Sequence, residues 1–270
     1  MTPTILLCDN GSRRAASTLS LRRLASDLSE RSGHPVHAVP LQHAGKIDPA
    51  RLDGKPAREL PDFLDDRLAA GDRAFLILPL FFGPSRAISS FIPQTAEQCR
   101  ARYGAFNLDV ADVLCPLPRG EPALAELLRD NVLRTAPQPG HVILVDHGSP
   151  IPEVTAVRQW LGARLDALIP SATLSEAVME RREGREYDFN GALLEDELER
   201  LAVAGHRRIT LAMLFLNPGR HAGEGGDIDQ IRVAAMERHP GLEVEASPLV
   251  GEHPALVDIL ARRLDSALEK

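Results

Sequence analysis

Cysteine is scarce in this sequence. The 270 residues include only Cys8, Cys99 and Cys115, and no two of them form a C-x-x-C pair. This spacing argues against a zinc knuckle or an iron–sulfur cluster. An odd number of widely separated cysteines is instead typical of buried thiols in a reducing compartment.

Long apolar runs are missing as well. None approaches the roughly 20 residues that a membrane-spanning helix needs, so we expect no membrane partner. The chain begins MTPTILLCDNGSRR, which passes directly into a strand pattern. It lacks the basic start and the apolar segment of a secretory signal, and we therefore expect a cytoplasmic protein.

Positive charge is not in excess. The formal net charge is -7, with 31 Lys and Arg against 38 Asp and Glu. This acidic balance argues against a nucleic-acid partner, which would call for a basic face.

Motifs of several enzyme classes are absent. The glycine-rich segment 217–228 is not followed by the G-K-[ST] of a phosphate loop. Ser12 and Ser149 follow glycines outside a G-x-S-x-G pattern, which favours turn or helix-cap roles over a nucleophile. The histidines form no H-x-x-x-H pair that would indicate a closed zinc site. We expect no tightly bound cofactor.

The sequence does contain a long internal repeat. ILLCDNGS near the start is matched by ILVDHGSP at residues 143–150, and LFFGPSRA at 80–87 lies over LFLNPGRH at 214–221 without a gap. Strand and helix patterns alternate in both halves, which predicts an α/β fold: two tandem domains, each a mostly parallel sheet with helices on both faces.

The domain boundary is predicted within RTAPQPGH, whose two prolines and one glycine are typical of a linker. The predicted domains are residues 1–135 and 140–270. The helices before Gly71 and Gly205 are predicted to end at these glycines.

Two histidines distinguish the halves. His147 follows the first strand of the later half, where the first half has Asn10, and His221 follows the third strand, where the first half has Ala87. Ligands bind beyond the carboxyl ends of parallel strands, so both histidines should reach one sheet edge. Each could also be an ordinary loop or cap residue. Together they suggest an open metal site.

Glu180 ends the second strand of the later half and should reach the same edge. It could serve as a general base or a metal ligand, or be a surface carboxylate paired with Arg181 or Arg182. Placing AV over AV puts Leu41 of the first half opposite Glu180. The charged segment ERREGREYDFN that follows could be a solvated loop or a lid.

Arginines and glycines flank these candidates. Arg220, and its counterpart Arg86 across a cleft, could bind carboxylates in bidentate fashion, or form ordinary surface ion pairs. Gly223, Gly225 and Gly226 would let the backbone approach a ligand closely.

These motifs resemble a known family. LVDHGSP after the first strand and LFLNPGRHAGEGGDI after the third look like the H-G-S and G-x-H…D-I elements of class II sirohydrochlorin chelatases of the CbiX/SirB type. The resemblance implies α/β domains occurring singly, as dimers or as fused repeats. It also implies an enzyme of the lyase class that inserts cobalt, iron or nickel into sirohydrochlorin, for cobalamin, sirohaem or coenzyme F430 synthesis.

The resemblance assigns roles by motif. His147 and His221 would be catalytic residues and metal ligands, with Glu180 as the less secure third member. Arg220, Arg86, Ser149 and Gly219 would contact the tetrapyrrole substrate. The first half would be a degenerate copy. The two repeats would form a pseudo-dimer within one chain, itself a monomer or a weak homodimer.

Other functions remain open from the sequence. The same residues would suit a non-catalytic protein that binds and delivers a metal or a tetrapyrrole. They would also suit a hydrolase or lyase acting on another substrate, or a structural partner without activity. Imidazole and carboxylate ligands accept cobalt, nickel, iron and zinc alike, so the metal is not determined.

Overall fold

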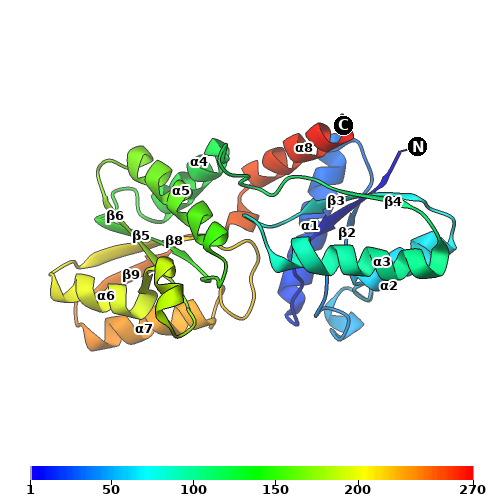
Figure 1. Ribbon diagram of the computed structural model, residues 1–270. Coiled ribbons are helices and arrows are strands. Elements are labelled where there is room, and N and C mark those ends of the chain that lie inside the picture. Colours follow the sequence, from blue (N-terminus) through cyan, green and yellow to red (C-terminus); the bar gives the residue numbers. More distant parts are fainter. Residues whose placement is uncertain (1, 270) are drawn as a thin grey trace. The chain divides into compact units, whose positions relative to one another are not determined.

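The computed structural model describes residues 2–269 (Figure 1). The chain divides into two compact units. The first unit combines Met1–Pro116 with Val257–Lys270, and the second is Leu117–Leu256. Within the described residues, no helix has both the length and the apolar character needed to cross a membrane.

The first unit contains a four-stranded parallel sheet with strand order β2-β1-β3-β4. Its strands are β1 (Thr4–Cys8), β2 (Val36–Ala38), β3 (Ala74–Pro79) and β4 (Asn107–Val110). Its helices are α1 (Ala15–Ser32), α2 (Leu60–Ala69), α3 (Ile92–Tyr103) and α8 (Ala255–Leu268), with a short 3-10 turn η1 (Pro49–Arg51) and a π-helical turn η2 (Ala87–Phe91).

The second unit contains a five-stranded parallel sheet with strand order β7-β6-β5-β8-β9. Its strands are β5 (His141–Asp146), β6 (Thr173–Val178), β7 (Ala192–Leu193), β8 (Arg208–Met213) and β9 (Glu243–Ala246). Its helices are α4 (Pro122–Thr135), α5 (Pro152–Leu168), α6 (Leu194–Val203) and α7 (Asp227–Arg238), with 3-10 turns η3 (Arg185–Asn190) and η4 (Val250–Glu252). The predicted fold class, two α/β repeats with parallel sheets, is confirmed.

Local sequence signals account for several element boundaries. Proline occupies the first helical turn of α4 and α5, where its missing N–H group costs no hydrogen bond. Gly71 and Gly205 follow α2 and α6 with positive φ angles of 102° and 92°, in agreement with the predicted helix ends. Every residue of β5 is buried, as expected for a central parallel strand covered on both faces.

The two units differ from the predicted domains, 1–135 and 140–270, in the placement of two helices. Helix α4 belongs to the second unit and α8 to the first. Asn131 of α4 donates from Nδ2 to the Pro248 carbonyl at 3.2 Å, within the second unit. Arg263 of α8 donates from Nε to the Val113 carbonyl at 3.0 Å, within the first. The period of a helix shows that one face is apolar but does not say which sheet that face covers.

The sheet of the second unit positions the candidate residues. Asp146 pairs with Val178 at the ends of β5 and β6, and Val145 pairs with Met213 at the end of β8. The residues that follow these three strands therefore emerge at the same carboxyl edge.

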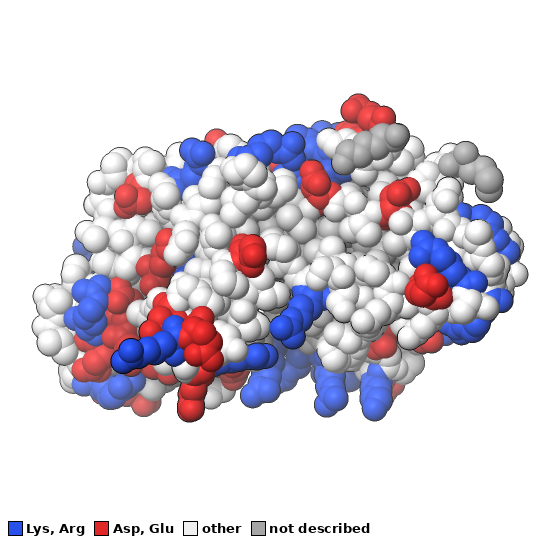
Figure 2. Space-filling model, in the orientation of Figure 1, with Lys and Arg blue, Asp and Glu red and all other residues white. Residues whose placement is uncertain are grey.

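Charged side chains of both signs are spread over the face shown in Figure 2, so the net charge of -7 forms no single acidic patch there.

Candidate active site

His147 and Glu180 lie side by side at this edge. The Glu180 amide donates to the His147 carbonyl at 3.1 Å, which extends the β5–β6 backbone pairing beyond the strands. His147 Nε2 is then 3.3 Å from Glu180 Oε1. This contact makes Glu180 a hydrogen-bond or ion-pair partner of the histidine ring.

His221 reaches the same place from the loop after β8. Its ring centroid is 4.6 Å from that of His147, with the two ring planes at 78°. The loop turns back onto the start of α7, where the Ile228 amide donates to the His221 carbonyl at 3.1 Å. The structure thus brings together all three predicted residues, His147, Glu180 and His221.

Asp227 is a further member of the cluster to which the sequence analysis gave no role. Its Oδ2 atom lies 2.7 Å from Nδ1 of His221. A carboxylate at this distance accepts the Nδ1 proton, so the free electron pair of the neutral ring is on Nε2. Asp227 is also the first residue of α7, where the helix dipole favours a negative charge. In the sequence, the sign of this role was the Asp-Ile pair that begins six residues after His221.

The turn that carries His147 depends on Gly148. Its φ angle is 87°, and a Cβ atom there would lie 2.0 Å from the Glu180 carbonyl oxygen. The Gly148 amide donates to Asp146 Oδ1 at 3.0 Å. Burial raises the pKa of Asp146, an effect that the Arg158 guanidinium opposes.

The first unit has the same turn, with Asn10 in place of His147. Gly11 has a φ angle of 79°, and a Cβ atom there would lie 1.8 Å from the Gln42 carbonyl oxygen. The Gln42 amide donates to the Asn10 carbonyl at 3.3 Å, as Glu180 does to His147. The residue opposite Glu180 is therefore Gln42 and not the predicted Leu41. The sequence alignment was short enough to slip by one residue.

The backbone around the second histidine position also differs between the units. Ala87, which aligns with His221, begins the π-helical turn η2, and this turn runs directly into α3. In the second unit the corresponding segment is an open loop that reaches α7 only at Asp227. Two glycines allow the backbone of this loop to turn, because Gly223 and Gly225 have positive φ angles of 118° and 68°.

The cluster is accessible to solvent. The side chains of His147, Glu180 and His221 are 46%, 61% and 29% exposed. Over residues 2–269, no three His, Cys, Asp or Glu side chains are arranged to enclose a metal ion. The two imidazole rings nevertheless lie in edge-to-face contact, with centroids 4.6 Å apart.

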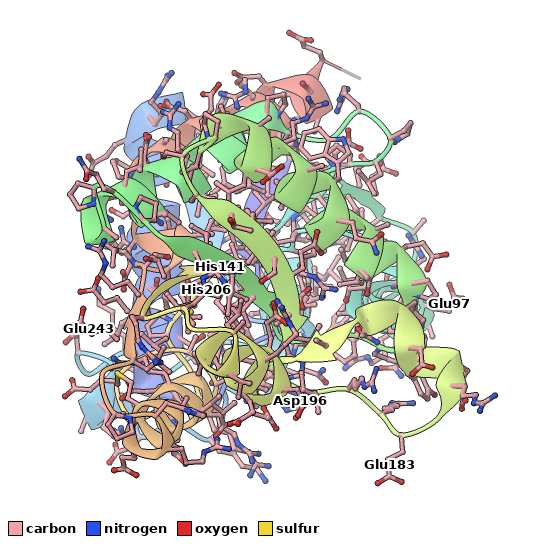
Figure 3. The ribbon with its side chains drawn as sticks, turned by 90° about the vertical axis from the view of Figure 1, so that its left-hand side faces the viewer. Glu97, His141, Glu183, Asp196, His206 and Glu243 are labelled. Carbon is pink, nitrogen blue, oxygen red and sulfur yellow. The ribbon has the colours of Figure 1, made fainter. Side chains whose placement is uncertain are left out.

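The arginine after Glu180 does not pair with it. Arg181 Nη1 lies 3.3 Å from Asp188 Oδ1 and donates to the Gly191 carbonyl at 3.1 Å. The Arg182 guanidinium lies 5.8 Å from the centre of the Tyr187 ring. The segment predicted as a loop or lid contains the short helix η3, and Figure 3 shows Glu183 at its outer end, pointing away from the sheet.

The predicted substrate-contacting residues have different surroundings. Arg220 is 77% exposed beside the cluster, with Nε 3.7 Å from Asp227 Oδ2. Arg86 is exposed at the corresponding edge of the first unit's sheet. Ser149 Oγ accepts the Ile151 amide at 3.0 Å, a turn interaction, and the Gly219 amide donates to the Ala222 carbonyl at 2.7 Å. Substrate binding by these four residues stays a prediction.

The matches to known proteins agree with this geometry. Residues 141–267 match the CbiX family model. The match lies entirely within the later half of this chain. The family resemblance predicted from the two histidine motifs is confirmed, and the matched range contains the whole cluster. No curated protein matches the sequence.

Solved structures share the fold over the full length. SirB from Bacillus subtilis with Fe³⁺ has a TM-score of 0.74 at 13% identity, covering 99% of this chain and 96% of that one. SirB from Bacillus subtilis subspecies spizizenii in complex with cobalt has a TM-score of 0.70 at 14% identity, with 100% and 96% covered. CbiX, described as the terminal enzyme for siroheme biosynthesis in denitrifying bacteria, has a TM-score of 0.64 at 18% identity, with 98% and 99% covered. At such low sequence identity, these matches show a common fold.

Proposed function

We propose that this protein is a chelatase that inserts a divalent metal ion into sirohydrochlorin or a closely related tetrapyrrole. The observation that carries the proposal is the His147–His221 ring pair, 4.6 Å apart at the carboxyl edge of the sheet in the region that matches the CbiX family model. The shared fold with SirB, solved with Fe³⁺ and with cobalt, and with the CbiX of siroheme biosynthesis supports the same class of reaction.

In this proposal the metal is a substrate and not a resident cofactor. His147 and His221 hold cobalt, nickel or iron through neutral ring nitrogens, and Asp227 keeps Nε2 of His221 free for the ion. The openness of the cluster suits an ion that has to be passed on. A site closed by four ligands would instead retain it.

Insertion exchanges protons for metal. The tetrapyrrole loses two pyrrole N–H protons as the nitrogens bind the ion, so a base near the ring promotes the reaction. Glu180, 61% exposed and in contact with His147, is the proposed proton acceptor. Arg220 and Arg86 are proposed to bind the peripheral carboxylates of the substrate, for which a guanidinium is the natural partner.

The test is an anaerobic insertion assay with sirohydrochlorin and, separately, Co²⁺, Ni²⁺ and Fe²⁺, followed by absorbance. The matched variant is His147→Asn with His221→Ala, which copies the residues of the first unit, Asn10 and Ala87. His239→Asn, a histidine that directly follows α7 and pairs with Glu199, serves as a control.

We expect insertion above the spontaneous rate for the wild type and the control, and the spontaneous rate for the double variant. An unaccelerated wild type with all three ions would disprove the proposed activity. Tight metal or tetrapyrrole binding in that case would favour the delivery protein instead.

A further inference from the structure

A buried arginine lies beneath the candidate active site. Arg158 of α5 is 2% exposed, and each of its three guanidinium nitrogens donates a hydrogen bond. Nη1 donates to Asp146 Oδ1 at 2.7 Å, Nε to Glu176 Oε2 at 3.0 Å, and Nη2 to the Asn190 carbonyl at 2.6 Å. One side chain therefore joins the end of β5, the middle of β6 and the segment before β7.

The partners of Arg158 hold the turn that carries His147. Asp146 Oδ1 accepts the Gly148 amide at 3.0 Å. The Asn190 side chain accepts the Ser149 amide at 3.0 Å and donates to the Ser149 carbonyl at 2.9 Å. The residues on both sides of His147 are thus bound to groups that Arg158 fixes.

The same network reaches the segment that follows Glu180. Asn190 Nδ2 also donates to the Tyr187 carbonyl at 3.1 Å. Arg158 binds Glu176 of β6, and Glu180 follows the end of that strand four residues later. Arg158 consequently fixes the strand and loop of Glu180 against the turn of His147.

The first unit builds the same turn without this network. The helices α1 and α5 start at Ala15 and Pro152, the same distance after Gly11 and Gly148, so Leu21 occupies the place of Arg158. Leu21 is completely buried.

The glutamate is missing from the first unit too. Leu7 pairs with Ala38 in the first sheet as Leu144 pairs with Glu176 in the second, so Ala38 occupies the place of Glu176. At these described positions, the arginine–glutamate pair is therefore present in the second unit, which carries His147 and His221, and not in the first.

This difference argues for a role beyond folding. A buried ion pair is often no more stabilising than well-packed apolar residues in its place, because both charges lose their hydration. The first unit shows that Leu21 and Ala38 suffice for the turn, in which Gly11 still donates to Asp9 Oδ1 at 3.0 Å. What the network adds is a fixed position for the His147 turn.

We propose that Arg158 is a positioning residue that holds His147 in register with Glu180 and His221 for metal transfer. This inference rests on the proposed function. Arg158 itself touches neither the ion nor the tetrapyrrole. Its loss should therefore lower kcat and weaken metal binding while leaving KM for the tetrapyrrole nearly unchanged.

The test uses the full chain with Arg158→Leu and Glu176→Ala together, which copies the first unit and leaves no unpaired arginine or glutamate behind. Outer partners of metal-binding histidines typically change affinity or activity about 10- to 100-fold. We expect a loss of this size in kcat and in Co²⁺ affinity, a changed Co²⁺ absorption spectrum, and a KM within about twofold of wild type. The thermal unfolding midpoint should fall, because the buried Asp146 loses its arginine partner, so the assays are run well below that midpoint.

Arg158→Lys provides a second measurement that does not depend on the double variant folding. Lysine keeps the charge but cannot reach three acceptors in the fixed geometry of a guanidinium, so we expect an intermediate kcat. Wild-type kcat and Co²⁺ affinity in a folded double variant, or in Arg158→Lys, would overturn the inference. An inactive wild type that binds no metal would instead overturn the proposed function, which keeps the two failures distinct.

Discussion

Nδ1 of His221 lies 2.7 Å from Oδ2 of Asp227, across the junction between the glycine-rich loop and α7. This contact selects the ring tautomer whose Nε2 electron pair is free, which is the form that ligates a metal or accepts a proton. It also ties the loop conformation to the start of a helix, so that the position of the ring follows from the fold.

Asp227→Asn should weaken this control. The amide has nearly the same size but accepts the Nδ1 proton less strongly and can present its own N–H group instead. We expect metal affinity and insertion rate to fall about 10- to 100-fold, measured by Co²⁺ titration and by the insertion assay. Glu224→Gln, the same charge change at an exposed carboxylate of the same loop, should stay near wild type. An Asp227→Asn variant with wild-type Co²⁺ affinity would show that the tautomer is not set by Asp227.

Glu180→Gln copies the first unit, where Gln42 takes this place. The amide keeps the size and the backbone bond to His147 but cannot accept a pyrrole proton. General base catalysis contributes about 10²- to 10⁴-fold, so kcat should fall within that range while KM changes little. Glu183→Gln, at the outer end of the following loop in Figure 3, is the matched control. Equal kcat values for the two variants would exclude Glu180 as the base.

Arg220→Ala should act on substrate binding. The guanidinium is 77% exposed beside the histidines, and a hydrogen-bonded charge pair with a carboxylate contributes about 1.5–3 kcal/mol. We expect KM for the tetrapyrrole to rise about 10-fold or more with kcat nearly unchanged, and Arg86→Ala tests the first unit in the same assay. Arg238→Ala, a half-exposed arginine of α7 that pairs with Glu199, should leave KM unchanged. An unchanged KM in Arg220→Ala would remove this residue from the substrate site.

His141, the first residue of β5, predicts a pH dependence of stability. It is 2% exposed, and its Nδ1 atom is buried without a hydrogen-bond partner among residues 2–269. Burial lowers the pKa of His141, and the nearby His206 lowers it further, with the ring centroids 5.0 Å apart, while Glu197 acts in the opposite direction. Figure 3 shows the two histidines side by side.

The free energy of unfolding should decrease as the pH falls, because the unfolded chain binds a proton at this histidine more readily than the folded protein does. An unfolded histidine takes up a proton near pH 6.5, and folded His141 does so only at lower pH. The stabilisation is therefore complete above about pH 6.5 and is lost as the pH falls through the folded pKa. The urea midpoint of the wild type should decrease between about pH 7.5 and about pH 5.5, and His141→Asn, which cannot be protonated, should show a smaller decrease. An identical decrease in both proteins would show that another group is responsible.

The repeat made most of the fold predictable. Strand and helix patterns occur twice in the same order, and β5 reads as a continuous apolar run because a central parallel strand is buried on both faces. The same comparison singled out His147, Glu180 and His221, since each lacks its counterpart in the first half. That the three meet follows from parallel strands, which bring their carboxyl ends to one edge.

Other features depended on contacts between distant residues. Local periodicity could not show that α4 and α8 belong to the units they join, since an apolar helix face can cover either sheet. Asp227 and Arg158 form hydrogen bonds with His221 and Asp146. A lone acidic or basic residue in a helix pattern gives no sign of such a partner.

The sequence by itself determined the duplicated α/β fold and which half carries His147, Glu180 and His221, because both are recorded in patterns along the chain. Only the tertiary structure decided which groups hold those residues in place. The direction of a side chain and the distance to its partner are set by the packing of strands, turns and helices that are far apart in the sequence.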